Sequence, residues 1–196
     1  MESFLSIKKD EIYTSEIVIN KSRFLGFAKF VESGDEAESF LNELREKYKD
    51  ARHICFAYKL RNSARLSDDG EPSGTAGKPI LNIIEKKGLV NVVIAVVRYF
   101  GGVKLGAGGL LRAYSGSAVD TIENAKIVEW LSSKIYEVEL DYKDYQPFIN
   151  NIKGRKIKVI DTNFDNGATL KVVASSDELI ENSTFIGDIF EYYEGE

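Results

Sequence analysis

The residues best suited to chemistry lie in a glycine-rich segment between Arg98 and Arg112, with the sequence RYFGGVKLGAGGLLR. Glycines let backbone amides approach a ligand closely, and the start of a helix presents free amides with a partial positive charge. The pattern therefore predicts an anion-binding surface; the alternative is that the glycines serve only turns and close packing. The predicted set in this segment is Arg98, Gly101, Gly102, Lys104, Gly106, Gly108, Gly109 and Arg112.

Other residues extend this surface, and two standard nucleotide fingerprints are missing from it. The chain has no G-x-x-x-x-G-K-[ST] and no complete G-x-G-x-x-G, which disfavours a mononucleotide or dinucleotide site of the usual kind. Nucleic-acid phosphate is the favoured anion. Further predicted cations are Lys21 and Arg23 in the segment KSRF, and Lys78. Aromatic residues near these cations that could stack on unpaired bases are Phe24, Tyr58, Tyr99 and Phe100.

A second candidate is the acidic segment DDGEPSGTAGKP. Asp68, Asp69 and Glu71 place three carboxylates within four residues, and such a group could hold Mg²⁺ through water and bridge it to phosphate. The same carboxylates could instead cap local amides or pair with nearby arginines. Mg²⁺ is therefore a possible cofactor, and no firm metal site is expected.

His53 and Cys55 do not form a catalytic pair in this interpretation. Two residues apart on a predicted strand, their Cα atoms lie about 6.5 Å apart, beyond the ~3 Å reach of a base. A single cysteine also offers no internal disulfide and favours a reducing compartment. The N-terminal residues lack the apolar core of a signal peptide, and no apolar run approaches ~18 residues. We expect a cytoplasmic protein without a membrane partner.

Charge is divided unevenly along the chain. Residues 1–125 hold 18 Lys and Arg against 17 Asp and Glu, a net charge of +1, whereas residues 126–196 hold 8 against 14, a net charge of −6. An acidic second half repels phosphate, so a nucleic-acid surface is expected on the first half.

Hydrophobic spacing predicts an α+β protein with two domains, 1–128 and 129–196. In the first domain, the spacing predicts paired strands with a turn near Asn20, a helix capped by Ser33, a strand over 53–60, a polar loop over 61–77, a helix over 79–87, a central strand over 89–99 and a helix from about Gly108.

The second domain is expected to be ferredoxin-like, with the order βαββαβ. Alternation predicts a strand over 136–142, and a helix follows over 145–154. Asn166 and Gly167 are typical of a tight hairpin. A second helix is expected after Ser175, containing Leu179, Ile180 and Ile186, and a strand over 188–193 closes the domain.

The segments KSRF, DDGEPSGTAGKP and RYFGG…LGAGGLLRAY resemble the YigZ/IMPACT family in order and spacing, over most of residues 15–125. The resemblance implies an N-terminal β-α domain like that of a small-subunit ribosomal protein and of the fourth domain of elongation factor G. A ferredoxin-like domain follows in the bacterial branch. It also implies translation-linked regulation with RNA or ribosome contact and no established reaction.

Three functions follow from these observations. The favoured one is a non-catalytic, translation-associated protein that binds RNA or the ribosome. The second is a Mg²⁺-assisted enzyme acting on a phosphorylated small molecule. The third is a module that binds a protein partner on the ribosome or a translation factor.

Overall fold

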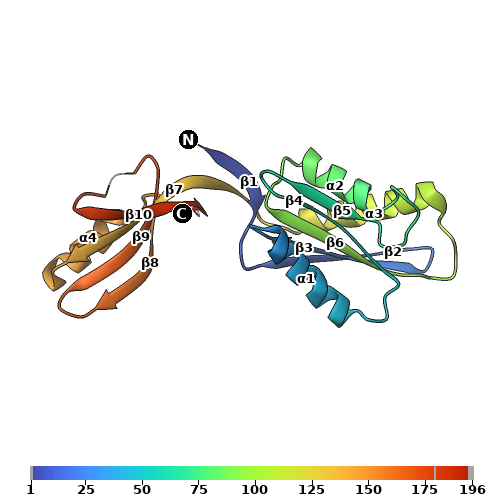
Figure 1. Ribbon diagram of the computed structural model, residues 1–196, viewed down its shortest axis with the longest axis horizontal. Coiled ribbons are helices and arrows are strands. Elements are labelled where there is room, and N and C mark those ends of the chain that lie inside the picture. Colours follow the sequence, from blue (N-terminus) through green and yellow to red (C-terminus); the bar gives the residue numbers. More distant parts are fainter. Residues whose placement is uncertain (1, 179, 194–196) are drawn as a thin grey trace. The chain divides into compact units, whose positions relative to one another are not determined.

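The computed structural model describes residues 2–178 and 180–193, which form two units, each with its own antiparallel sheet (Figure 1). One unit is Leu5–Val128; the other combines the residues up to Phe4 with those from Glu129 onward. Sheets and helices in both units confirm the α+β class. None of the described helices is long and apolar enough to cross a membrane.

The sheet of the Leu5–Val128 unit has β6 at its centre. Its strands are β2 (Ile12–Ile19), β3 (Ser22–Phe30), β6 (Val92–Tyr99), β4 (His53–Lys59) and β5 (Ala64–Ser67), in this spatial order. The first seven residues of β6 are buried, which explains why its sequence is a continuous apolar run rather than an alternating one. The central strand therefore provides a fixed support for the loop that follows Tyr99.

Helices cover both faces of this sheet (Figure 1). On one face, α1 (Gly34–Lys47) packs Phe40 and Leu41 against a cluster that includes Phe27. The other face carries α2 (Gly77–Lys86) and α3 (Gly106–Glu123). Ser33 caps α1 as predicted, because its side chain accepts a hydrogen bond from the amide of Glu36.

The segment 61–77 differs from the predicted polar loop. It contains the short strand β5, and several residues of its last part are buried, among them Glu71, Thr75 and Ala76. A polar sequence can be buried when its polar groups find internal hydrogen-bond partners. Glu71 meets this condition through Arg98 and Tyr114.

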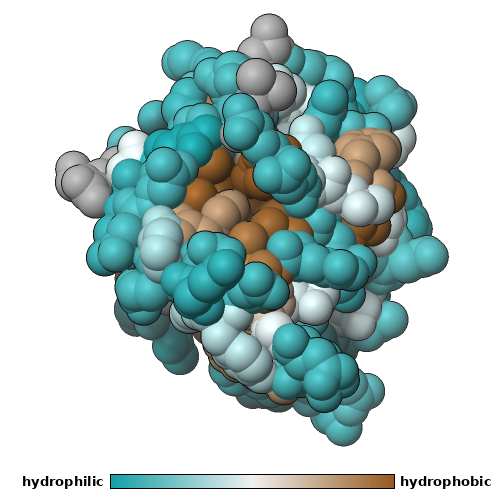
Figure 2. Space-filling view, turned by 90° about the vertical axis from the view of Figure 1, so that its left-hand side faces the viewer, coloured by the Kyte–Doolittle hydropathy of each residue, from teal (hydrophilic) through white to brown (hydrophobic). Residues whose placement is uncertain are grey.

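The second unit combines one helix with a sheet. Its elements are β7 (Ile127–Leu140), α4 (Tyr142–Ile152), β8 (Ile157–Phe164), β9 (Ala168–Ser175) and β10 (Ser183–Tyr192). The strand order is β10-β7-β9-β8, and β1 (Ser3–Ile7) also pairs with β7. Figure 2 looks at this unit and shows apolar residues gathered in a hollow bordered by hydrophilic ones.

The second helix predicted for this unit is wrong for the residues that the structure describes. Ile186 lies in β10, and Leu179 lies outside the described residues. After β9, the hydroxyl of Ser175 donates to Asp177, and the amide of Ser176 donates to the carbonyl of Ser132 at 3.1 Å. These bonds hold the chain in a turn against β7 in place of a helical first turn.

Candidate functional site

The glycine-rich loop packs directly on the β2–β3 turn. The amide of Gly101 donates to Oγ of Ser22 at 3.1 Å. A Cβ atom at Gly101 would lie 2.0 Å from the carbonyl carbon of Lys21. No side chain fits in this space, so the glycine brings the KSRF and RYFGG segments together.

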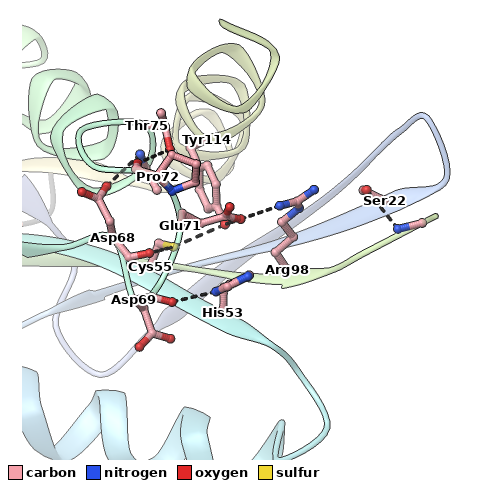
Figure 3. Close-up of polar contacts among 12 residues, drawn as sticks. Ser22, His53, Cys55, Asp68, Asp69, Glu71, Pro72, Thr75, Arg98 and Tyr114 are labelled. Carbon is pink, nitrogen blue, oxygen red and sulfur yellow. Dashed lines mark hydrogen bonds and ion pairs between the residues drawn. The ribbon is translucent and has the colours of Figure 1, made fainter. Parts of the chain in front are cut away.

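Arg98, near the end of β6, is buried in an ion pair with Glu71. Its side chain is 7% exposed, and its Nη1 donates to Oε1 of Glu71 at 2.6 Å. The same oxygen accepts a hydrogen bond from the hydroxyl of Tyr114 at 2.8 Å (Figure 3). The guanidinium carbon lies 5.4 Å from the ring centre of Phe24 and 5.7 Å from that of Phe100. The Nε atom of Arg98 is buried and has no hydrogen-bond partner.

A pocket of about 410 Å³ lies beside this ion pair, and Glu71, Arg98, Lys104 and Gly106 are among the residues that line it. It is the place where the two sequence candidates meet, because the acidic segment supplies Glu71 and the glycine-rich segment supplies the others. The sequence indicated no role for five further lining residues, which are Arg52, Pro72, Leu105, Ala107 and Leu110.

The first turn of α3 borders the same pocket through Leu105, Gly106 and Ala107. No side chain caps this helix at Leu105, and its first turn contains no acidic residue. The first amides of a helix lack internal partners and carry partial positive charge. Together with Arg98 and Lys104, they give the pocket the donors and charge that an anion requires.

Of the remaining predicted cations, Lys104 lines this pocket, and Lys21, Arg23, Lys78 and Arg112 do not. Lys104 is exposed and lines it. Arg112 is exposed on α3, with Nη1 3.6 Å from where a Cβ atom of Gly108 would lie. Lys21 and Arg23 flank Ser22, and Arg23 pairs with Glu16 at 2.8 Å. Lys78 is exposed in the first turn of α2 and does not line the pocket.

The three carboxylates predicted to assist a metal ion bond to protein groups at separate places. Asp68 accepts hydrogen bonds from the amides of Gly74, Ala76 and Gly77 at 2.7–2.9 Å. Burial opposes ionisation of Asp68, but these amides outweigh it and lower the pKa of its carboxyl.

Asp69 and Glu71 also have partners of their own. Asp69 accepts from the amide of Ile54 at 2.7 Å, and Glu71 bonds Arg98. No group of three or more His, Cys, Asp or Glu side chains in the described part of the chain is arranged to hold a metal ion. Asp68 and Asp69 thus cap local amides and Glu71 pairs with an arginine, which is the alternative that the sequence left open, and Mg²⁺ binding at these carboxylates stays a prediction.

His53 and Cys55 contact different groups. Nδ1 of His53 lies 2.7 Å from the carbonyl oxygen of Asp69. The thiol of Cys55 donates to the carbonyl of Asp68 at 3.0 Å and lies 3.3 Å from the hydroxyl of Tyr114. Burial raises the pKa of the Cys55 thiol well above its usual value, so a reactive thiolate is disfavoured at neutral pH.

Of the four aromatic residues proposed to stack on bases, two lie in the core. Phe24 is fully buried against Tyr114, and Tyr58 is also buried. Tyr99 donates its hydroxyl to Asp50 at 2.9 Å. Phe100 is 48% exposed and lines the pocket, so it is the candidate that the structure leaves accessible there.

These features define a two-unit α+β protein with a candidate pocket at a glycine-rich loop, and comparison with known proteins gives its family. The model of the Impact N-terminal domain family matches residues 20–122. An IMPACT family member from Haemophilus influenzae is 30% identical over 196 residues, which cover 94% of each chain. The chain belongs to the IMPACT family, as the resemblance implied.

Further relatives give the same family. IMPACT family member YigZ from Escherichia coli is 30% identical, over 87% of this chain and 86% of that protein. IMPACT family member YvyE from Bacillus subtilis is 39% identical over 72% of this chain, and the match spans 66% of that protein's length. A crystal structure described as that of a hypothetical protein has a TM-score of 0.65 and 30% identity, covering 90% of this chain and 87% of that one.

Proposed function

We propose that this protein is a translation-associated regulator that binds RNA, free or on the ribosome, through the pocket at the glycine-rich loop. Membership of the IMPACT family supports the proposed role in translation, because the resemblance to this family implies translation-linked regulation. The RNA-binding part is supported by one observation above all. A buried arginine with an unpartnered Nε lies beside an uncapped helix N-terminus.

The chemistry of the pocket suits a phosphate group. An unpartnered buried donor such as Nε of Arg98 costs free energy until an acceptor reaches it. The amides at the start of α3 point positive charge to the same region, and Lys104 adds a full charge that remains in contact with water. An oxyanion in the pocket would contact the α3 amides and Lys104 directly, and it would reach Nε of Arg98 only after a local movement, because that atom is closed to solvent in this structure.

Phe100 adds to this pocket an exposed aromatic ring on which an unpaired base of single-stranded RNA can stack. Its ring is about half exposed and lies next to the guanidinium of Arg98. Unstacked bases bind to such rings, whereas an intact duplex hides its base faces. The modest net charge of the first 125 residues, +1, favours a local site over an extended basic surface.

Replacing Lys104 with alanine is expected to weaken RNA binding. The lost phosphate contact should lower affinity across RNA sequences and reduce the slope of log affinity against log salt by about one unit. Fluorescence anisotropy with a labelled single-stranded RNA, measured over a range of salt concentrations, gives both quantities.

Lys47→Ala is the matched control for this measurement, because Lys47 is exposed on α1, which covers the opposite face of the sheet. Its affinity and salt slope should equal those of the wild type. An unchanged slope in the Lys104 variant, with the same RNA still bound, would exclude Lys104 from the phosphate contact.

A further inference from the structure

The hydrogen bond of His53 fixes which of its ring nitrogens carries the proton. Nδ1 lies 2.7 Å from the carbonyl oxygen of Asp69. A carbonyl oxygen only accepts hydrogen bonds, so Nδ1 must be the donor. In the neutral imidazole the other nitrogen, Nε2, then has no proton and can only accept. His53 therefore presents Nε2 as a hydrogen-bond acceptor.

This acceptor belongs to the pocket. His53 begins β4, directly opposite Arg98 on β6, and both residues line the pocket with Phe100 and Lys104. Figure 3 shows the second ring nitrogen of His53 on the side of the ring away from Asp69. The other charged side chains that line the pocket are Arg52, Arg98 and Lys104, which donate, and Glu71, whose Oε1 already accepts hydrogen bonds from Arg98 and Tyr114.

A ligand for this pocket must combine acceptors with one donor. A phosphodiester supplies only acceptors, so it satisfies Arg98, Lys104 and the α3 amides but places no hydrogen on Nε2 of His53. The ribose 2′-hydroxyl is a donor on the same nucleotide, and deoxyribose lacks it. A volume of about 410 Å³ is within the range of small-ligand sites.

We infer that the pocket holds one ribonucleotide and that Nε2 of His53 accepts a hydrogen bond from its 2′-hydroxyl. The phosphate contacts the donors around Arg98, and the base lies against Phe100. The protein then selects RNA over DNA by this hydrogen bond. The inference rests on the proposed function for the phosphate contact. It adds that the sugar of the bound nucleotide is ribose and not deoxyribose.

Three labelled hexamers of one sequence test this inference: RNA, DNA and 2′-O-methyl RNA. Wild-type protein should bind the RNA about fivefold tighter than the other two, since one hydrogen bond contributes about 1 kcal/mol and 1.4 kcal/mol is a factor of ten. His53→Phe keeps a ring without an acceptor and should bind all three hexamers alike. His53→Gln carries an amide oxygen that can accept and should keep part of the preference.

The outcomes separate the inference from the proposed function. Equal wild-type binding of RNA, DNA and 2′-O-methyl RNA would overturn the inference and leave nucleic-acid binding intact. A preference for RNA that survives in a folded His53→Phe variant would also overturn it. The wild-type comparison needs no variant, so it decides the matter even if His53→Phe does not fold.

Adenosine 5′-monophosphate and its 2′-deoxy form distinguish a free ribonucleotide from an RNA strand. Stronger binding of the ribose form that depends on His53, with no binding of any hexamer, would uphold the ribonucleotide pocket and refute RNA binding. No binding of any hexamer or of either mononucleotide would refute both. Binding of the RNA hexamer with the His53-dependent preference would support both.

Discussion

Replacing Glu71 with alanine is expected to lower the free energy of unfolding by about 3–5 kcal/mol, the usual cost of removing one partner from a buried ion pair. The side chains of Glu71 and Arg98 are 4% and 7% exposed, and Oε1 of Glu71 bonds both Arg98 and Tyr114. The variant leaves the Arg98 charge buried without its carboxylate. Chemical denaturation followed by circular dichroism measures the loss.

Two further variants interpret this result. Glu71→Ala combined with Arg98→Met removes both charges and should recover part of the lost stability, because no buried charge remains. Glu16→Ala breaks the exposed pair with Arg23 and should leave the denaturation midpoint nearly unchanged. A Glu71 variant as stable as the wild type would contradict the buried ion pair.

Replacing Gly101 with alanine is expected to destabilise the protein by about 3 kcal/mol, at the upper end of the usual cost of overpacking. The added Cβ atom would lie 2.0 Å from the carbonyl carbon of Lys21 and 2.3 Å from the amide nitrogen of Ser22. Both are backbone atoms, so the clash is relieved only if the loop or the β2–β3 turn moves. RNA affinity should fall with stability, because the same loop leads into α3.

Gly102→Ala is the matched control at the next position. Gly102 has a φ of +86°, and an added Cβ atom would meet nothing within 4 Å. Alanine there carries only the cost of a left-handed backbone, about 1–2 kcal/mol. Thermal and chemical unfolding of both variants should place Gly101→Ala clearly below Gly102→Ala. The reverse order would contradict the packing of the glycine-rich loop on the turn.

Much of the fold could be predicted from the sequence, because helix caps and tight turns depend on contacts between residues that are close together in the chain. Ser33 caps α1 through a contact three residues away, and the β2–β3 turn forms at Asn20 and Lys21, both with positive φ. The apolar run of β6 indicated its central place. The prediction of a helix after Ser175 was wrong, because the helical spacing of Leu179, Ile180 and Ile186 is also compatible with a turn followed by a strand.

The candidate site was less predictable, since its main contacts join distant parts of the chain. Glu71 was interpreted within a polar loop, and nothing near it in sequence indicates burial beside a residue 27 positions away. One signal was available: Arg98 lies near the end of a strand that is otherwise apolar, and a buried arginine needs a carboxylate. Phe24 was assigned to base stacking for its neighbouring cations, but its side chain lies under Arg98, in the core.

RNA binding at the start of α3 is tested most directly by nuclear magnetic resonance. The backbone amide and arginine Nε–H signals of the ¹⁵N-labelled protein would be followed during titration with a single-stranded RNA hexamer. We expect the largest shifts at Gly106, Ala107 and Gly108, together with Nε of Arg98, because these donors meet the phosphate. Shifts confined to the β7–β10 unit, with the signals of α3 and Arg98 unchanged at saturation, would contradict the proposed site.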